Sequence, residues 1–151
     1  MQEAFGGLLN IFIIVMFIII VEGILAFTVS YTKAFRMKNY VISVIEQYEG
    51  SGCFCDGGTA CKDKIYQHAD QIHYKPTALQ CHNGAKSVDG LFCVSTTGSA
   101  PEGMNSSTNK YYRIVTQVDI NIPIINNIMG LEFFQVSGDT RLINLQSAGD
   151  C

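Results

Sequence analysis

The chain has no excess of basic residues and none of the sequence patterns that mark common catalytic sites. Its 151 residues include 10 lysines and arginines against 13 aspartates and glutamates, so its formal net charge is -3. A nucleic-acid-binding domain is expected to carry a basic stripe, and we therefore predict no nucleic-acid partner. A glycine-rich phosphate loop, a GxSxG nucleophile elbow and an EF-hand pattern are all missing. We accordingly expect a protein that is not an enzyme and needs no cofactor.

Strongly polar residues are almost absent from residues 8–29, where Asn10 and Glu22 are the only two. The central part of this run, residues 11–21, is apolar throughout and leaves no face for water. A helix needs about 20 mainly apolar residues to cross the hydrocarbon layer of a membrane. We therefore predict that residues 1–30 form one transmembrane helix. A cleaved secretory signal is the alternative, but the run lacks a basic flank before it and a small-x-small cleavage site after it.

Helix-breaking residues are also absent beyond the run, since residues 25–48 contain neither proline nor glycine. Apolar residues there recur close to the i, i+3, i+4, i+7 spacing of an amphipathic helix. They are Tyr31, Ala34, Phe35, Val41, Ile42, Ile45 and Tyr48. We predict that the helix continues as an amphipathic segment over residues 31–50 and is stopped by the Gly-Ser-Gly sequence at residues 50–52.

All six cysteines follow this helix, in a predicted head domain of residues 51–151. A domain of roughly 100 residues has only a modest core, and disulfides compensate for that outside the cytosol. We predict a disulfide-bonded head on the extracytoplasmic side of the membrane, with the near neighbours Cys53, Cys55 and Cys61 bonded to different partners. The candidates are Cys53, Cys55, Cys61, Cys81, Cys93 and Cys151, and their spacing does not select one pairing.

A zinc site is the alternative interpretation of the first three cysteines together with His68, His73 and His82. The Cys-x-Cys-x5-Cys spacing lacks the paired CxxC knuckles of common structural zinc sites. The disulfide interpretation is therefore the stronger one, and we predict no metal site.

One small basic cluster, Lys33, Arg36 and Lys38, follows the apolar run, whereas the N-terminal flank carries only Glu3. By the positive-inside rule alone, this asymmetry would keep the C-terminal side in the cytoplasm. Six cysteines in a reducing compartment are harder to explain, so the extracytoplasmic prediction stands. A basic leader removed before Met1 would resolve the conflict. The cluster could contact anionic lipid or a neighbouring subunit, or it could be the solvated face of the helix.

Strand patterns dominate the second half of the head. Residues 90–97 are rich in β-branched and aromatic residues, and residues 111–122 alternate between apolar and polar side chains up to Pro123. Residues 131–145 are predicted to pair with 111–122 as an antiparallel hairpin, with Gly138 at a bulge or bend. The other predicted elements are a short helix near residues 62–72 and a polar loop over residues 98–109. The predicted fold is α+β, with the long helix packed on a small antiparallel sheet.

An ionisable side chain within a membrane span is costly unless it is paired, neutralised or near the interface. Glu22, about two thirds of the way along the run, is therefore a candidate polar contact with a neighbouring subunit, or a carboxyl that reaches the headgroups. Asn10 is a second candidate for an interhelical hydrogen bond, although its place at the edge of the run favours an interfacial side chain.

The succession of an apolar helix, its amphipathic continuation and a small disulfide-bearing head resembles type IV pilin-like proteins, and is most similar to TadE-like minor pilins or pseudopilins. The resemblance rests on residues 18–27, which contain Glu22, and on the terminal hairpin from Tyr112 through residues 123–130 to residues 140–142. The cysteine-rich middle of the chain is not part of that pattern, and the sequence shows no basic leader with a prepilin-peptidase site.

The resemblance implies a non-enzymatic subunit, held in the cell membrane by its single helix, that joins a surface filament used for adhesion, secretion or DNA uptake. Its partners would then be the membrane, other pilin-like subunits and further copies of itself. The alternative is a single-pass, membrane-anchored binding module or accessory subunit that does not polymerise.

Overall fold

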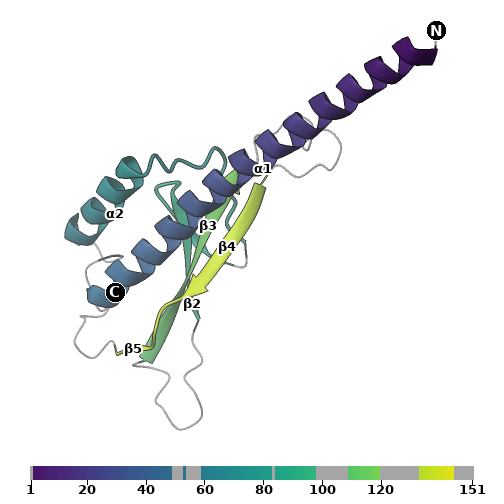
Figure 1. The fold of residues 1–151 in the computed structure, drawn as a ribbon. Helices are drawn as coiled ribbons and strands as arrows, with labels where there is room; N and C mark the ends of the chain where they lie inside the picture. The colour runs from purple at the N-terminus through teal and green to yellow at the C-terminus, as the bar shows by residue number, and fades with distance from the viewer. Residues whose placement is uncertain are drawn as a thin grey trace.

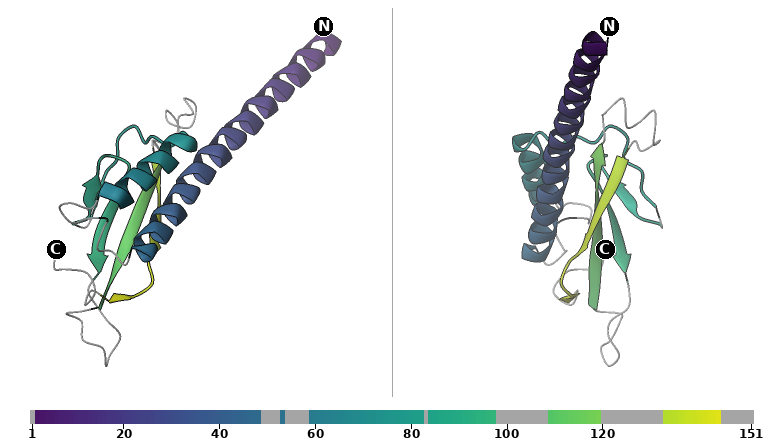
Figure 2. Two further views of the ribbon diagram at one scale, coloured as in Figure 1. Left: turned by 90° about the vertical axis from the view of Figure 1, so that its left-hand side faces the viewer. Right: turned by 45° about the vertical axis from the view of Figure 1, so that its right-hand side comes forward.

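A computed structural model describes residues 2–48, 53, 59–82, 84–97, 109–119 and 133–144. One long helix, α1 (Gln2–Gln47), runs across one face of an antiparallel sheet, and a second helix, α2 (Thr59–Gln71), lies beside its C-terminal half (Figure 1). The N-terminal half of α1 projects beyond the rest of the protein (Figure 2). The predicted α+β fold is confirmed, including the uninterrupted passage from the apolar to the amphipathic part of the helix.

The sheet contains β1 (Lys86–Val88), β2 (Phe92–Thr97), β3 (Asn109–Asp119) and β4 (Phe133–Asp139) in that spatial order. A short fifth strand, β5 (Ile143–Asn144), pairs with the beginning of β3. All pairings are antiparallel. The predicted hairpin is therefore present, but its second strand is split into β4 and β5, and β1 was not predicted. The predicted loop over residues 98–109 and residues 120–122 of the predicted strand lie almost wholly outside the described residues.

Gly138 does not form the bulge or bend that the sequence suggested. The pairing of β3 with β4 continues without interruption from Arg113 with Asp139 to Asp119 with Phe133, and Gly138 sits opposite Ile114. A Cβ atom at Gly138 would lie 2.9 Å from Ile42 Cδ1 and 3.1 Å from Lys38 Cδ. The glycine therefore allows α1 to approach the sheet closely, which is the other common role of a glycine inside a strand.

The core lies between α1 and the sheet. Ala34, Met37, Val41 and Ile45 are fully buried and repeat at helical spacing along one face of α1. Burying a methionine, valine or isoleucine side chain stabilises a fold by about 1.5 to 3 kcal/mol. The buried side chains opposite them on the sheet are Tyr112, Ile114, Thr116, Val118 and Val136. The Thr116 hydroxyl lies 3.1 Å from the Ala34 carbonyl oxygen and 3.3 Å from that of Val136, so it satisfies a polar group inside this layer.

Two disulfides tie the connecting segments to this core. Cys53 bonds Cys61 at the start of α2, and their Cα atoms lie 5.0 Å apart. The prediction that these near neighbours have different partners was wrong. Cys81 bonds Cys93 and joins the segment after α2 to β2. The other two candidates, Cys55 and Cys151, lie outside the described residues.

Helix α2 ends in a left-handed turn. The Tyr74 amide donates to the Ala69 carbonyl and the His73 amide donates to the Asp70 carbonyl, which is the hydrogen-bond pattern of a Schellman motif. His73 takes the left-handed position, with φ of 52°, where glycine is the usual residue. The turn directs residues 74–80 along the edge of β3.

Candidate functional site at the junction of the two halves of α1

The apolar run of residues 8–29 has almost no contact with the rest of the protein. Leu8 is 71% exposed, Phe12 67% and Phe17 66%, and none of the apolar side chains in the run is buried. The most hydropathic window of α1 is likewise unburied, and by length and composition this helix is a candidate membrane span. A surface that is apolar on every side requires either lipid or other apolar helices around it.

Glu22 and Asn10 are exposed on this apolar cylinder, and neither side chain has a hydrogen bond or ion pair with any residue that the structure describes. Twelve positions separate them, which at 1.5 Å and about 100° per residue is about 18 Å along the axis and about 120° around it. The two polar side chains therefore face different directions. A single neighbouring helix that packs along one stripe of α1 would meet one of them and not the other.

The threonines near the end of the run satisfy their own hydroxyl groups. Thr28 Oγ1 donates to the Ile24 carbonyl oxygen and Thr32 Oγ1 donates to that of Thr28, both at 2.8 Å. Such local bonds allow a hydroxyl to enter an apolar environment at little cost. Glu22 has no equivalent arrangement among the described residues, which keeps it as the polar group in the run most in need of an external partner.

A row of aromatic rings marks the junction between the two halves of α1. Phe27, Tyr31 and Phe35 are spaced at i, i+4 and i+8, and successive ring centroids are 6.2 Å apart. Tyr31 is 37% and Phe35 40% exposed, so neither packs into the core as the periodicity predicted. Aromatic side chains with a polar end, such as tyrosine, prefer the interface between membrane and water. The row lies where the apolar run gives way to the amphipathic half of α1.

The basic cluster predicted from the sequence is divided by the fold. Arg36 is exposed and Lys33 is half-buried, whereas Lys38 is only 9% exposed. The Lys38 ammonium lies 4.3 Å from the centre of the Phe35 ring, and its stem passes close to Gly138. The solvated-face interpretation is therefore wrong for Lys38, whereas contact of the cluster with lipid or a neighbouring subunit stays a prediction. Its aliphatic stem helps to fill the layer between α1 and β4, as long basic side chains often do.

The segment of residues 74–80 runs beside the second half of β3, where β2 no longer pairs with it. The Tyr74 hydroxyl donates to the Gln117 carbonyl oxygen and accepts from the Gln117 amide, at 2.9 and 3.0 Å. The Gln117 side chain bonds the main chain of Ala78 and Gln80. Gln117 was predicted to face away from the core, and it does, but this segment covers it and leaves it only 2% exposed. Burial raises the pKa of Tyr74 to about 12.

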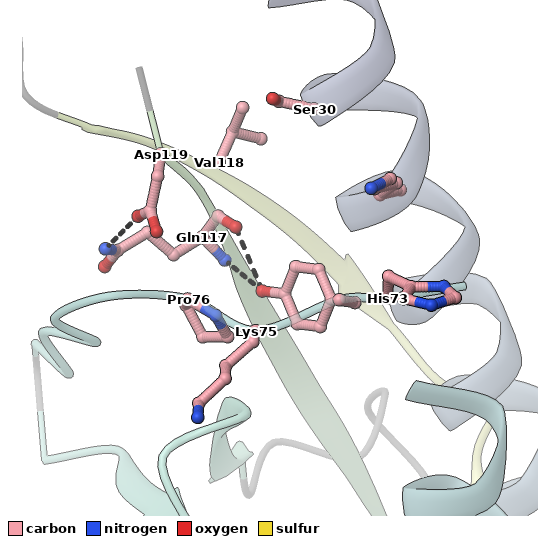
Figure 3. A pocket seen from close by; sticks show the side chains of 9 residues that line it. Ser30, His73, Lys75, Pro76, Gln117, Val118 and Asp119 are labelled. Carbon is pink, nitrogen blue, oxygen red and sulfur yellow. Dashed lines mark hydrogen bonds between the residues drawn. The ribbon is translucent and has the colours of Figure 1, made fainter. Parts of the chain in front are cut away.

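A pocket of about 130 Å³ opens where this segment meets α1. Its lining side chains come from α1, the turn after α2 and the end of β3 (Figure 3). They are Ser30, Lys33, His73, Tyr74, Lys75, Pro76, Gln117, Val118 and Asp119. Only Lys33 among them was a predicted site residue. No spacing pattern connects Lys75 or His73 with α1, because the pocket depends on how the turn after α2 is placed.

The metal alternative loses two of its ligands, because Cys53 and Cys61 are bonded to each other. In the described ranges, no group of three or more histidine, cysteine or acidic side chains is arranged to hold a metal ion. His68 instead stacks on Tyr40, with ring centroids 3.9 Å apart, and burial lowers its pKa.

Comparison with known proteins gives no relative from which a role could be transferred. No protein-family model, no curated protein and no solved structure matches this chain.

Proposed function

We propose that this protein is a membrane-held structural subunit of a surface filament, similar to TadE-like minor pilins or pseudopilins, with its head on the extracytoplasmic side. The proposal rests above all on the apolar run, which is exposed on every side yet continues as one helix into the core of the head. Such a helix can exchange lipid for neighbouring helices without losing its own hydrogen bonds.

Two other observations support the proposal. The disulfides Cys53–Cys61 and Cys81–Cys93 favour an oxidising compartment for the head. Glu22 offers a polar group that a neighbouring helix could satisfy, and a buried polar residue can set the register of packed helices. Asn10, on a different side of the helix, could meet a second neighbour. These features suit a packed bundle of helices better than a solitary anchor.

The proposal is tested by asking what surrounds residue 17 in material recovered from the cell surface. A photoreactive benzoylphenylalanine replaces Phe17, whose ring is 66% exposed. We expect illumination to produce a ladder of cross-linked chains, and electron microscopy of the same material to show filaments. Cross-links to lipid alone, together with monodisperse particles, would contradict the proposal and favour the anchored binding module.

The role of Glu22 is tested with a pair of variants of similar size. We expect Glu22→Leu to weaken assembly about fivefold, since an interhelical polar contact in a membrane contributes on the order of 1 kcal/mol. Glu22→Gln keeps a hydrogen-bonding side chain and should retain most of the assembly. Sedimentation of filaments from detergent provides the measurement. Unchanged assembly of the leucine variant would remove Glu22 from the proposed contact.

A further inference from the structure

We propose that Phe134 of β4 inserts into the interfacial layer of the lipid bilayer and seats the head on the membrane surface. Among the described residues of the head, Phe134 is the only large apolar side chain that is exposed, at 51%. A single exposed apolar side chain needs no explanation by itself, and the inference depends on where this one lies. It rests on the membrane-held part of the proposed function but not on filament formation.

Phe134 lies on the face of the sheet that α1 covers. The strand partner of Phe134 is Val118 and that of Val136 is Thr116, and paired residues share a face of the sheet. The Thr116 hydroxyl bonds the Ala34 carbonyl oxygen, so this face is the one that packs on α1. Val136 is buried under the helix, whereas Phe134, two residues before it in β4, is exposed. The cover that α1 provides therefore ends between these two residues.

Phe134 also lies at the level where the apolar run of α1 ends. Its strand partner Val118 lines the pocket together with Ser30, the residue that directly follows the run. In agreement with this, β4 begins at the end of the head from which the N-terminal half of α1 projects (Figure 2). As a helix, the run of residues 8–29 is about 33 Å long, which matches a hydrocarbon layer of about 30 Å. A bilayer that encloses the run consequently has its headgroup region beside Ser30 and Phe134.

The aromatic row of α1 extends this apolar margin on the side of β4. Lys38 places the row on that side, because its ammonium lies over the Phe35 ring and its stem passes close to Gly138. Phe134 precedes Gly138 by four residues in β4 and is on the same face. Phe27, the first member of the row, is itself part of the apolar run. The exposed aromatic side chains of α1 and β4 therefore border one side of the junction and are continuous with the surface that requires lipid or other helices.

The acidic residue at this end of β3 is held on the other side of the sheet. Asp119 pairs with Phe133, so it lies on the opposite face from Phe134. Its carboxylate accepts hydrogen bonds from the Thr77 amide at 2.6 Å and from Gln117 Nε2 at 2.8 Å. The face that presents Phe134 to lipid is thus separate from the one that holds this charge.

The experiment uses tryptophan fluorescence, because the chain contains no tryptophan and one substitution introduces a single reporter. Phe134→Trp places the reporter at the proposed contact, and Phe17→Trp places it in the apolar run. Thr96→Trp is the matched control, since Thr96 is exposed on the same face of the sheet. Thr96 pairs with Tyr112 and Phe134 with Val118, so the control lies about 20 Å further from the run at about 3.4 Å per residue. Each full-length variant is reconstituted into phosphatidylcholine vesicles whose lipid is brominated either near the headgroup end or near the methyl end of its acyl chains.

We expect bromines near the headgroup end to quench most of the Phe134→Trp emission, which should also lie at a shorter wavelength than that of Thr96→Trp. The control should keep its emission, and Phe17→Trp should be quenched by bromines near the methyl end. If Phe17→Trp is quenched in this way and Phe134→Trp behaves like the control, the head contact is overturned while the membrane span stands. If Phe17→Trp is not quenched, the span fails and the head contact fails with it.

A photoreactive benzoylphenylalanine in place of Phe134 provides a second probe and distinguishes lipid from a neighbouring copy of the chain. The full-length variant is illuminated in phosphatidylcholine vesicles, and the adducts are identified by mass spectrometry. We expect adducts with phospholipid. Adducts with a second chain and none with lipid would overturn the proposal and assign Phe134 to an interface between copies.

Discussion

The two halves of α1 belong to one continuous helix but are stabilised in different ways. From residue 8 to residue 29 the helix is apolar on nearly all sides and has almost no contact with the described part of the head, whereas from Ala34 to Ile45 it is apolar on one face and that face is buried against the sheet. In the first half the surroundings must come from outside the chain. In the second half the chain supplies them itself. The comparison teaches that hydrophobicity alone does not locate the core of this protein. The stretch of α1 that packs on the core is the one in which polar residues occupy the faces opposite the apolar one.

The junction between the halves carries the features that neither half has alone. The aromatic row crosses it, and the pocket lined by Ser30 and Lys33 opens there. The second half of α1 packs on the head directly after the apolar run, and residues of the turn after α2 therefore line a pocket together with α1.

The largest expected effect comes from substituting one methionine in each half of α1. Met37 is fully buried and Met16 is 56% exposed. We expect Met37→Ala to lower the free energy of unfolding of the head by about 2 to 5 kcal/mol, because it leaves a cavity between α1 and the sheet. Met16→Ala should leave that free energy unchanged. Guanidinium unfolding of the full chain in detergent, followed by near-ultraviolet circular dichroism of the tyrosines, measures both. Equal losses in the two variants would contradict the division of α1.

A second prediction separates the halves by pH. The pKa of Tyr74 is about 12 in the folded head, because burial disfavours its charged form, against about 10 in an unfolded chain. The protonated hydroxyl therefore contributes stability that is fully present below pH 10 and is lost as the pH rises through 12. At about 1.4 kcal/mol per pKa unit, the loss reaches about 3 kcal/mol. We expect the free energy of unfolding of the head to fall by this amount in this window, while the apolar half of α1, enclosed in a micelle, stays helical.

This second prediction is tested by comparing how the free energy of unfolding falls with pH in the parent chain and in Tyr74→Phe. The variant is less stable at neutral pH, since it lacks both hydrogen bonds to Gln117. Its stability should nevertheless fall less steeply between pH 10 and 12, because the group that titrates has been removed. The parent chain also contains Tyr112, whose pKa burial raises as well, and that tyrosine is common to both proteins and cancels. Parallel slopes in the two proteins would show that Tyr74 does not control the alkaline loss.

The sequence was sufficient to predict the long helix, the α+β fold and the central hairpin, because each depends on a local period of apolar residues. The helix could be followed through the junction since no proline or glycine interrupts residues 25–48. Periodicity failed where another segment of the chain changed the surroundings. Lys38 is polar yet buried, because Gly138 lets its stem pass between α1 and β4, and Gln117 is polar yet buried, because residues 74–80 cover it.

The candidate sites divide along the same line. Glu22 and Asn10 could be identified from the sequence, because a polar residue in an apolar run is conspicuous by itself. The pocket could not, since its lining residues Lys33 and Tyr74 are 41 positions apart and share the lining only through the left-handed turn at His73. The pairing of Cys53 with Cys61 was likewise missed, because it depends on where the start of α2 lies relative to Cys53.

The smallest of the expected effects tests how closely the second half of α1 approaches the sheet. Gly138→Val places side-chain carbons where Ile42 Cδ1 already lies 2.9 Å from the position of a Cβ atom. We expect a loss of about 1 to 3 kcal/mol, as is usual when a packed layer must accommodate extra carbons. Ser137→Val, on the adjacent exposed position of β4, serves as the matched control and should change stability by less than about 0.5 kcal/mol. Combining Gly138→Val with Ile42→Ala should recover part of the loss, because the alanine vacates the space that the valine needs. If the double variant is no more stable than the sum of the two single changes predicts, close approach of α1 is not the reason for glycine at this position.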